Sequence, residues 1–212
     1  MSVLKLENVS YSYAGTDNPV IKDLSCEFEK GKIYSIVGRS GAGKTTLLSL
    51  LSGLASPTAG KIYMNGEDID KIDKYEYRSR YVGVIFQSFN LMPKLTAVEN
   101  VILSMDIAGK PFPGKKAYAM DQLKKVHLSE EEGERRVLKL SGGQQQRVAI
   151  ARALSYGPEI ILADEPTGNL DGETQEEIMN IFKELAHKEE KCVILVTHSP
   201  DVADASDEVY QL

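Results

Sequence analysis

Four short apolar segments along the chain each end at a glycine or a polar residue. Their sequences are KIYSIVG, VGVIFQ, EIILADE and CVILVTHS, which end around Gly38, Gln87, Glu165 and His198. Nearly continuous apolar runs of this length are typical of strands buried on both faces, as in a parallel sheet covered by helices. The pattern therefore predicts an α/β fold with a mostly parallel sheet.

Helical patterns lie between these predicted strands. Five leucines of residues 45–54 (TTLLSLLSGL), the last of them Leu54, fall on one stripe of a helix, and residues 173–188 show the same spacing. Ligands of open α/β sheets sit beyond the carboxyl ends of the strands. If the four strands are neighbours, their polar ends should therefore converge on one site.

Composition and charge narrow the classes of function. The chain has 212 residues, of which 42% are hydrophobic, which suffices for one sizeable core. Its net charge is −6 and it has no block of Lys and Arg, so direct binding to nucleic acid or anionic lipid is disfavoured. Cys26 and Cys192 fit no disulfide or zinc pattern, which favours a reduced, cytosolic compartment. We expect neither a signal peptide nor a membrane helix, since no basic-then-apolar leader and no apolar run of about 20 residues occurs.

The sequence GRSGAGKT, from Gly38 to Thr45, follows a predicted strand and opens a predicted helix. This context supports the G-x-x-x-x-G-K-[ST] pattern, whose backbone N–H groups surround phosphate oxygens. Lys44 is expected to reach the β- and γ-phosphates, and Thr45 to offer its hydroxyl to Mg²⁺. The sequence predicts that the chain binds a nucleoside triphosphate through Gly38, Arg39, Ser40, Gly41, Ala42, Gly43, Lys44, Thr45 and Thr46.

Two acids follow the third apolar segment. Asp164 can hold the metal ion through its water shell, and Glu165 can polarise an attacking water. Acidic residues also cap helices, so this pair alone is only moderately specific. At the other strand ends, Gln87 and His198 each have a simpler interpretation as a solvated strand end or a core histidine. Beside the phosphate site, His198 becomes a candidate contact for the γ-phosphate.

The stretch LSGGQQQRVAIARAL, from Leu140 to Leu154, joins a Ser-Gly-Gly turn to an amphipathic helix. Ser141 can cap this helix, and the backbone N–H groups of Gly142 and Gly143 can approach an anion closely. Physical reasoning alone leaves open whether the helix faces its own phosphate site or that of another copy.

The combination of LSGGQ with QQRVAIARAL resembles the signature of the ABC family, and further motifs match in order along nearly the whole chain. These are Tyr13, residues 38–45, Gln87, the Asp164–Glu165 pair, GNLD ending at Asp171, and His198. The resemblance implies an ABC transporter ATPase with a P-loop NTPase core, a small antiparallel β subdomain and an inserted helical subdomain. It places the nucleotide-binding core in residues 1–87 and 158–212 and the helical subdomain in residues 88–157.

The resemblance also implies partners and roles. Two copies would meet head to tail with ATP between them, so that Ser141, Gly142, Gly143 and Gln144 act on the partner's ATP. Tyr13 would stack on adenine, although strand alternation leaves Tyr11 as an alternative. Gln87 would sense Mg²⁺ and the attacking water, Asp171 would communicate across the dimer, and the segment after Gln87 would contact an integral membrane permease. Its apolar residues, Leu91, Met92 and Leu95, fit either this contact or a subdomain core.

Two stretches, FQSFNLMPKLTAVENV and ADEPTGNLDGET, look most like the macrolide-export and lipoprotein-release branch, so export is expected. The protein would then be cytoplasmic and peripheral at the inner face of the membrane through its permease.

The sequence departs from the family pattern in two places. The stretch LSEEEGERRVLKLSGG is highly charged and lacks the proline often seen before the signature, and the chain ends at EVYQL. A DNA-repair or chromosome ATPase and a ribosome-acting ABC protein are the alternatives. The coiled-coil or zinc insertion of the first and the tandem cassettes of the second do not occur in this sequence.

Overall fold

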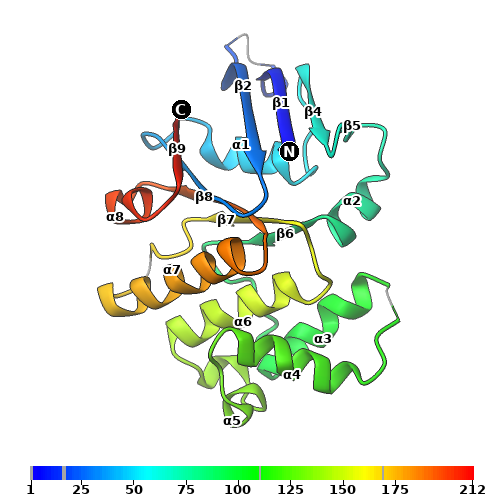
Figure 1. Ribbon diagram of the computed structural model, residues 1–212, viewed down its shortest axis with the longest axis vertical. Coiled ribbons are helices and arrows are strands. Elements are labelled where there is room, and N and C mark those ends of the chain that lie inside the picture. Colours follow the sequence, from blue (N-terminus) through cyan, green and yellow to red (C-terminus); the bar gives the residue numbers. More distant parts are fainter. Residues whose placement is uncertain (1, 16–17, 110, 169) are drawn as a thin grey trace.

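The computed structural model describes residues 2–15, 18–109, 111–168 and 170–212. Figure 1 shows a central parallel sheet with α1 and an antiparallel sheet on one side and α6 and α7 on the other. The parallel sheet has the strand order β6-β7-β8-β3-β9. Its strands are β3 (Ile33–Val37), β6 (Val82–Ile85), β7 (Ile160–Asp164), β8 (Cys192–Thr197) and β9 (Glu208–Gln211).

The four apolar segments are neighbours in this sheet, which is the condition for their polar ends to converge on one site. Asp164 pairs with Val196 and Val37 pairs with Thr197, so the strands end at one edge. Alternate residues of each strand point to opposite faces of the sheet. Leu162 and Ile194 belong to the hydrophobic core on the face toward the antiparallel sheet, and their neighbours along the strands belong to the core on the other face. The expectation of an α/β fold with a parallel sheet is confirmed.

A second sheet is antiparallel, with the order β2-β1-β4-β5. Together with α1 it encloses one hydrophobic core against the parallel sheet, whereas the other core lies among the remaining large helices. The strands are β1 (Ser2–Tyr11), β2 (Ile21–Glu29), β4 (Ala59–Met64) and β5 (Glu67–Asp68).

Helices α3 to α6 pack against one another at the end of the molecule far from the antiparallel sheet (Figure 1). The division into a core of residues 1–87 and 158–212 and a helical subdomain of residues 88–157 remains a proposal. None of the helices formed by the described residues has the length and apolar character that spanning a membrane requires. The helices are α1 (Lys44–Leu51), α2 (Lys74–Arg80), α3 (Ala97–Ile107), α4 (Lys115–Lys125), α5 (Glu130–Gly133), the 3₁₀ turn η1 (Val137–Lys139), α6 (Gly142–Leu154), α7 (Gly172–His187) and α8 (Pro200–Asp204).

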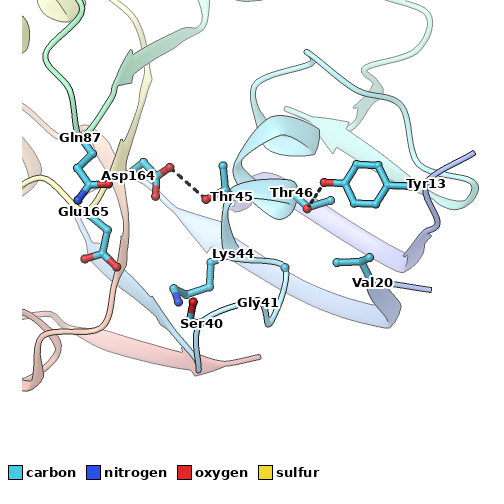
Figure 2. Close-up of a pocket in the computed structure, with 11 residues that line it drawn as sticks. Tyr13, Val20, Ser40, Gly41, Lys44, Thr45, Thr46, Gln87, Asp164 and Glu165 are labelled. Carbon is cyan, nitrogen blue, oxygen red and sulfur yellow. Dashed lines mark hydrogen bonds between the residues drawn. The ribbon is translucent and has the colours of Figure 1, made fainter. Parts of the chain in front are cut away.

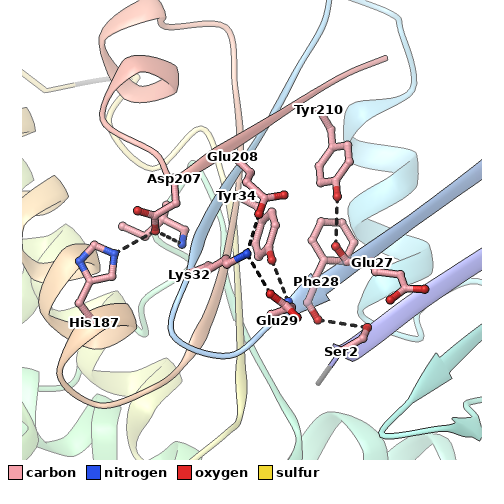
Figure 3. A network of polar contacts seen from close by, with 11 residues as sticks. Ser2, Glu27, Phe28, Glu29, Lys32, Tyr34, His187, Asp207, Glu208 and Tyr210 are labelled. Atoms are coloured by element: carbon pink, nitrogen blue, oxygen red, sulfur yellow. Dashed lines mark hydrogen bonds and ion pairs between the residues drawn. The ribbon is translucent and has the colours of Figure 1, made fainter.

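The end of the chain forms β9, a strand that the sequence pattern did not identify. It lies beside β3, and the residues before and within it are tied to the rest of the molecule by polar contacts (Figure 3). Asp207 accepts a hydrogen bond from the backbone N–H of Ile33 at 2.7 Å and lies 2.9 Å from His187 Nε2, while Lys32 donates to Glu208 at 2.8 Å. These contacts fix the final residues along the edge of the core sheet.

Two local expectations were wrong. Leu54 does not continue the buried stripe of α1, because the helix ends at Leu51 and Gly53 then turns the chain with φ +67°. Leu54 is consequently 57% exposed. Tyr13 does not share a strand face with Tyr11, because β1 ends at Tyr11.

Candidate active site

The loop between β3 and α1 forms a cradle of backbone groups. Gly41 and Gly43 adopt the left-handed region, with φ +80° and +95°, which only glycine enters without strain. Space also requires glycine at position 43, since a Cβ there would lie 2.8 Å from Val20 Cγ1. Gly43 precedes α1 without a side-chain cap, so the N–H groups of the first turn face the loop without a capping acceptor. Lys44 Nζ donates to the carbonyl of Gly38 at 2.8 Å.

A pocket of about 460 Å³ opens over this cradle (Figure 2). It brings together residues from the ends of β3, β6 and β7, which are three of the four strands whose polar ends were predicted to converge. Gly38, Arg39 and Ala42, also predicted to bind the nucleotide, complete the loop but do not line the pocket. The lining residues are Tyr13, Val20, Ser40, Gly41, Gly43, Lys44, Thr45, Thr46, Gln87, Asp164 and Glu165.

Thr45 and Asp164 lie together at the inner end of the pocket. The Thr45 hydroxyl donates to Asp164 Oδ2 at 3.2 Å (Figure 2). Burial raises the pKa of Asp164 above its ordinary value of 3.8, the hydrogen bond from Thr45 opposes this shift, and the charge of Glu165 adds to it. The two oxygen atoms form a compact pair of the kind that binds a hard divalent cation.

Glu165 is held in place by the end of β8. Its Oε1 lies 2.7 Å from His198 Nδ1, and its Oε2 accepts hydrogen bonds from the Thr197 hydroxyl at 3.2 Å and the His198 backbone N–H at 3.3 Å. The Glu165 side chain is only 13% exposed, whereas that of His198 is 71% exposed. His198 therefore contacts the predicted base directly, and it does not itself line the pocket.

Tyr13 lies at the opposite rim of the pocket. Its hydroxyl is 2.8 Å from Thr46 Oγ1 (Figure 2), and its ring packs edge-on against Tyr11 with ring centroids 5.2 Å apart. Of the two tyrosines, Tyr13 lines the pocket. Tyr13 is therefore the tyrosine placed to reach a bound nucleotide, and its contact with adenine remains a prediction.

The signature residues lie elsewhere in the chain. Ser141 and Gln144 form a capping box at the start of α6: Ser141 Oγ accepts from the Gln144 N–H at 3.2 Å, and Gln144 Oε1 accepts from the Ser141 N–H at 2.8 Å. Neither these residues nor Gly142 and Gly143 line the pocket of their own chain, and α6 lies on the other side of the core sheet from α1 (Figure 1).

Asp171 caps α7 and does not line the pocket either. Its carboxylate accepts from the Thr174 N–H at 2.9 Å and the Thr174 hydroxyl at 3.0 Å, and the backbone hydrogen bond lowers the pKa of Asp171. Asn169, within the GNLD stretch, lies outside the described residues.

A groove of about 410 Å³, which we call the α3 groove, lies beside the segment that follows Gln87. Met92 and Ile107 are 47% and 59% exposed in it, whereas Leu91 packs against the helical core. Of the apolar residues exposed in this groove, the sequence had indicated Met92 alone. It also gave no signal for Val20, which lines the nucleotide pocket. The groove is lined by Leu54, Arg78, Val82, Val84, Phe86, Asn90, Met92, Asn100, Leu103, Ser104, Ile107, Arg152 and Tyr156.

Comparison with known proteins gives a consistent result. The family model described as ABC transporter matches residues 21–168. An uncharacterised ABC transporter ATP-binding protein of Bacillus subtilis, YclH, is 48% identical over 98% of this chain and 92% of its own length. The lipoprotein-releasing system ATP-binding protein LolD of Francisella tularensis is 40% identical over 99% of this chain and 93% of its own. The macrolide export protein MacB of Syntrophobacter fumaroxidans is 37% identical over the whole chain, which corresponds to 30% of MacB.

A solved structure agrees with the sequence relatives. The dimeric structure of MJ0796, a bacterial ABC transporter cassette, superposes with a TM-score of 0.88 at 38% identity, covering 99% of this chain and 94% of that one. The chain belongs to the ABC transporter family, and it is the ATP-binding, ATP-hydrolysing type of subunit. The resemblance to the macrolide-export and lipoprotein-release branch is confirmed.

Proposed function

We propose that the chain is the ATPase of an export system, in which two copies close head to tail around ATP and thereby move a separate membrane permease. The observation that carries the proposal is the placement of Glu165. It lies at the nucleotide pocket, beside Asp164, and is held by three contacts from Thr197, the last residue of β8, and from His198 directly after it.

The cradle supports binding of ATP by its phosphates. The N–H groups of the loop and of the first turn of α1 carry positive partial charge toward the pocket. Lys44 now donates to backbone carbonyls of its own loop and can exchange them for β- and γ-phosphate oxygens. Tyr13 at the rim offers a ring face to adenine, and Thr46 beside it offers a hydroxyl.

The pair formed by Thr45 and Asp164 fits Mg²⁺, which prefers oxygen ligands and keeps part of its water shell. When bound, this ion would neutralise the charge that develops on the phosphates. Gln87 lines the same end of the pocket and has an amide that can orient a water molecule. The proposed metal-site residues are therefore Thr45, Gln87 and Asp164.

Glu165 is the proposed general base. Its carboxylate accepts a proton from the attacking water, and the hydrogen bonds from Thr197 and His198 fix its direction. The exposed ring of His198 remains able to contact a γ-phosphate at the mouth of the site. Holding the base in one rotamer before the substrate arrives removes an ordering cost from the reaction.

The signature helix supports a site shared between two chains. Ser141 and Gly142 are exposed at the start of α6, where the unpaired N–H groups of a helix attract an anion. These groups are separated from the pocket of their own chain, so a second copy would have to supply them. The Asp171 carboxylate, bound to Thr174 near Gly143, would lie at the same junction.

The α3 groove is the proposed docking site of the permease. Leu54, Met92, Leu103 and Ile107 expose apolar surface there, and a contiguous apolar patch favours a protein partner. Phe86 and Asn90, on either side of Gln87 in the sequence, line the groove. A movement of the partner can therefore shift Gln87 at the proposed metal site. This arrangement would place the chain in the cytoplasm at the inner face of the membrane, without direct contact to lipid or nucleic acid.

Replacement of the proposed base tests this assignment. Glu165→Gln keeps the size of the side chain but removes its basicity, so ATP turnover should fall by roughly 10²- to 10⁴-fold while ATP binding persists. Glu76→Gln removes an acid that pairs with Arg80 on α2, outside the residues that line the pocket, and serves as the matched control. Phosphate release measures turnover, and titration with a fluorescent nucleotide measures binding. Undiminished turnover in Glu165→Gln would refute the assignment.

A further inference from the structure

The charged segment before the signature touches the signature directly. Glu132, in α5, accepts a hydrogen bond from Gln144 Nε2 at 2.6 Å through its Oε1. Its other oxygen, Oε2, accepts from the Ser129 N–H at 2.7 Å in a capping box of its own. One carboxylate thus joins the starts of two helices, α5 and α6.

This contact fixes the orientation of the Gln144 amide. Because Nε2 of Gln144 faces the Glu132 carboxylate, Oε1 must face the Ser141 N–H, where the structure has it at 2.8 Å. A flipped amide would place an oxygen against Glu132 and an NH₂ group against the Ser141 N–H, and would lose both hydrogen bonds. Glu132 thereby selects the amide orientation that closes the Ser141 cap.

The carboxylate is itself well suited to this task. The hydrogen bond from the Ser129 backbone lowers the pKa of Glu132, so it stays charged and acts only as an acceptor. Gly133 packs α5 closely against α4, where an added Cβ would lie 2.7 Å from Met120 Sδ. The Ala97 N–H also donates to the Arg135 carbonyl at 2.9 Å, which ties the same segment to α3.

We propose that Glu132 is a positioning residue for the shared ATP site, acting through Gln144 to hold Ser141 and the first turn of α6 ready for the partner's γ-phosphate. The inference rests on the proposed head-to-tail dimer. It gives the charged segment, which lacks the proline often found before the signature, a role in fixing the start of α6. It also specifies a glutamine at position 144, because a carboxylate there would face the carboxylate of Glu132.

An exchange of the two side chains tests the inference. Glu132→Gln has one acceptor oxygen for two donors, and Gln144→Glu puts two carboxylates together, so each single variant should lower ATP turnover about tenfold. In the double variant, the amide now at position 132 can donate to the carboxylate now at position 144, while the amide oxygen accepts from the Ser129 N–H. The exchanged carboxylate can also accept from the Ser141 N–H. Every hydrogen bond is restored, so turnover should return to within about threefold of the original protein.

The controls separate positioning from folding and from the proposed function. The nucleotide affinity of the single chain and its thermal unfolding midpoint should change little in all three variants, because neither residue lines the nucleotide pocket of its own chain. Glu131→Gln, which removes the neighbouring charge paired with Arg135, should leave turnover unchanged. The inference is overturned if the exchange gives no rescue, or if the single variants match Glu131→Gln while Ser141→Arg abolishes turnover. If Ser141→Arg also leaves turnover unchanged, the proposed shared site fails instead.

Discussion

The guanidinium of Arg152 donates to the backbone carbonyl of Phe89 at 2.8 Å. The same side chain donates to the carbonyl of Asn90 at 2.5 Å, and burial lowers its pKa. Phe89 and Asn90 both adopt the left-handed region, with φ +57° and +50°, which is unusual for residues other than glycine. A charged fork on the signature helix therefore holds the strained turn that follows Gln87.

Arg152→Lys should loosen this turn. A lysine keeps the charge but offers a single ammonium nitrogen on a flexible stem, in place of the planar guanidinium whose two nitrogens reach the two carbonyls in a fixed geometry. We expect the free energy of unfolding to decrease by about 1–3 kcal/mol, as measured by urea denaturation. Arg80→Lys is the matched control, because Arg80 is exposed and pairs only with Glu76 one helical turn away among the described contacts. Equal effects of the two substitutions would contradict a special role of the fork.

The two signature glycines should differ in their tolerance of a methyl group. A Cβ on Gly143 would lie 2.5 Å from Thr174 Cγ2, whereas a Cβ on Gly142 would lie 3.9 Å from Leu170 Cδ2, an ordinary contact. Gly143→Ala should therefore reduce the free energy of unfolding by about 1–3 kcal/mol through overpacking. Gly142→Ala should leave it unchanged or raise it by up to about 1 kcal/mol through helix propensity. Thermal unfolding of both variants measures the difference, and the reverse order would show that α6 and α7 are not packed this closely.

Tyr13 should contribute to ATP affinity and Tyr11 should not. Tyr13 lines the pocket, while Tyr11 ends β1 outside the lining residues and packs edge-on against the Tyr13 ring. Loss of a base-stacking ring removes about 1–3 kcal/mol, so Tyr13→Ala should weaken ATP binding roughly 5- to 150-fold. Titration with ATP followed by calorimetry measures the affinity. A larger effect from Tyr11→Ala would reverse the assignment.

The local sequence pattern was sufficient to predict the buried strands and the loop whose glycines need a positive φ. The apolar runs that became β3, β6, β7 and β8 are mostly buried, and their pairing in one sheet brings Asp164 and Glu165 to the pocket edge. The glycine spacing of residues 38–45 predicted a cradle because Gly41 and Gly43 need positive φ.

Other features could not be obtained from pattern, for physical reasons. β9 has only four residues, and none of them is buried, so its sequence carries no strong strand signal. Arg152 and Phe89 are 63 residues apart, and a contact between a side chain and a backbone carbonyl leaves no periodicity. The link between Glu132 and Gln144 depends likewise on how α5 packs, although the unusual charge of the segment was visible.

The central claim is that two copies of the chain close around ATP. The most direct test is light scattering on the Glu165→Gln variant, with and without ATP and in the absence of Mg²⁺, so that hydrolysis cannot reopen the dimer. The account predicts that ATP shifts the mass from one chain of 23.4 kDa to two, and that Ser141→Arg abolishes the shift. A Glu165→Gln protein with Ser141 intact that binds ATP fully and still remains a single chain would contradict the shared site in the isolated protein, as would a Ser141→Arg variant that dimerises as well.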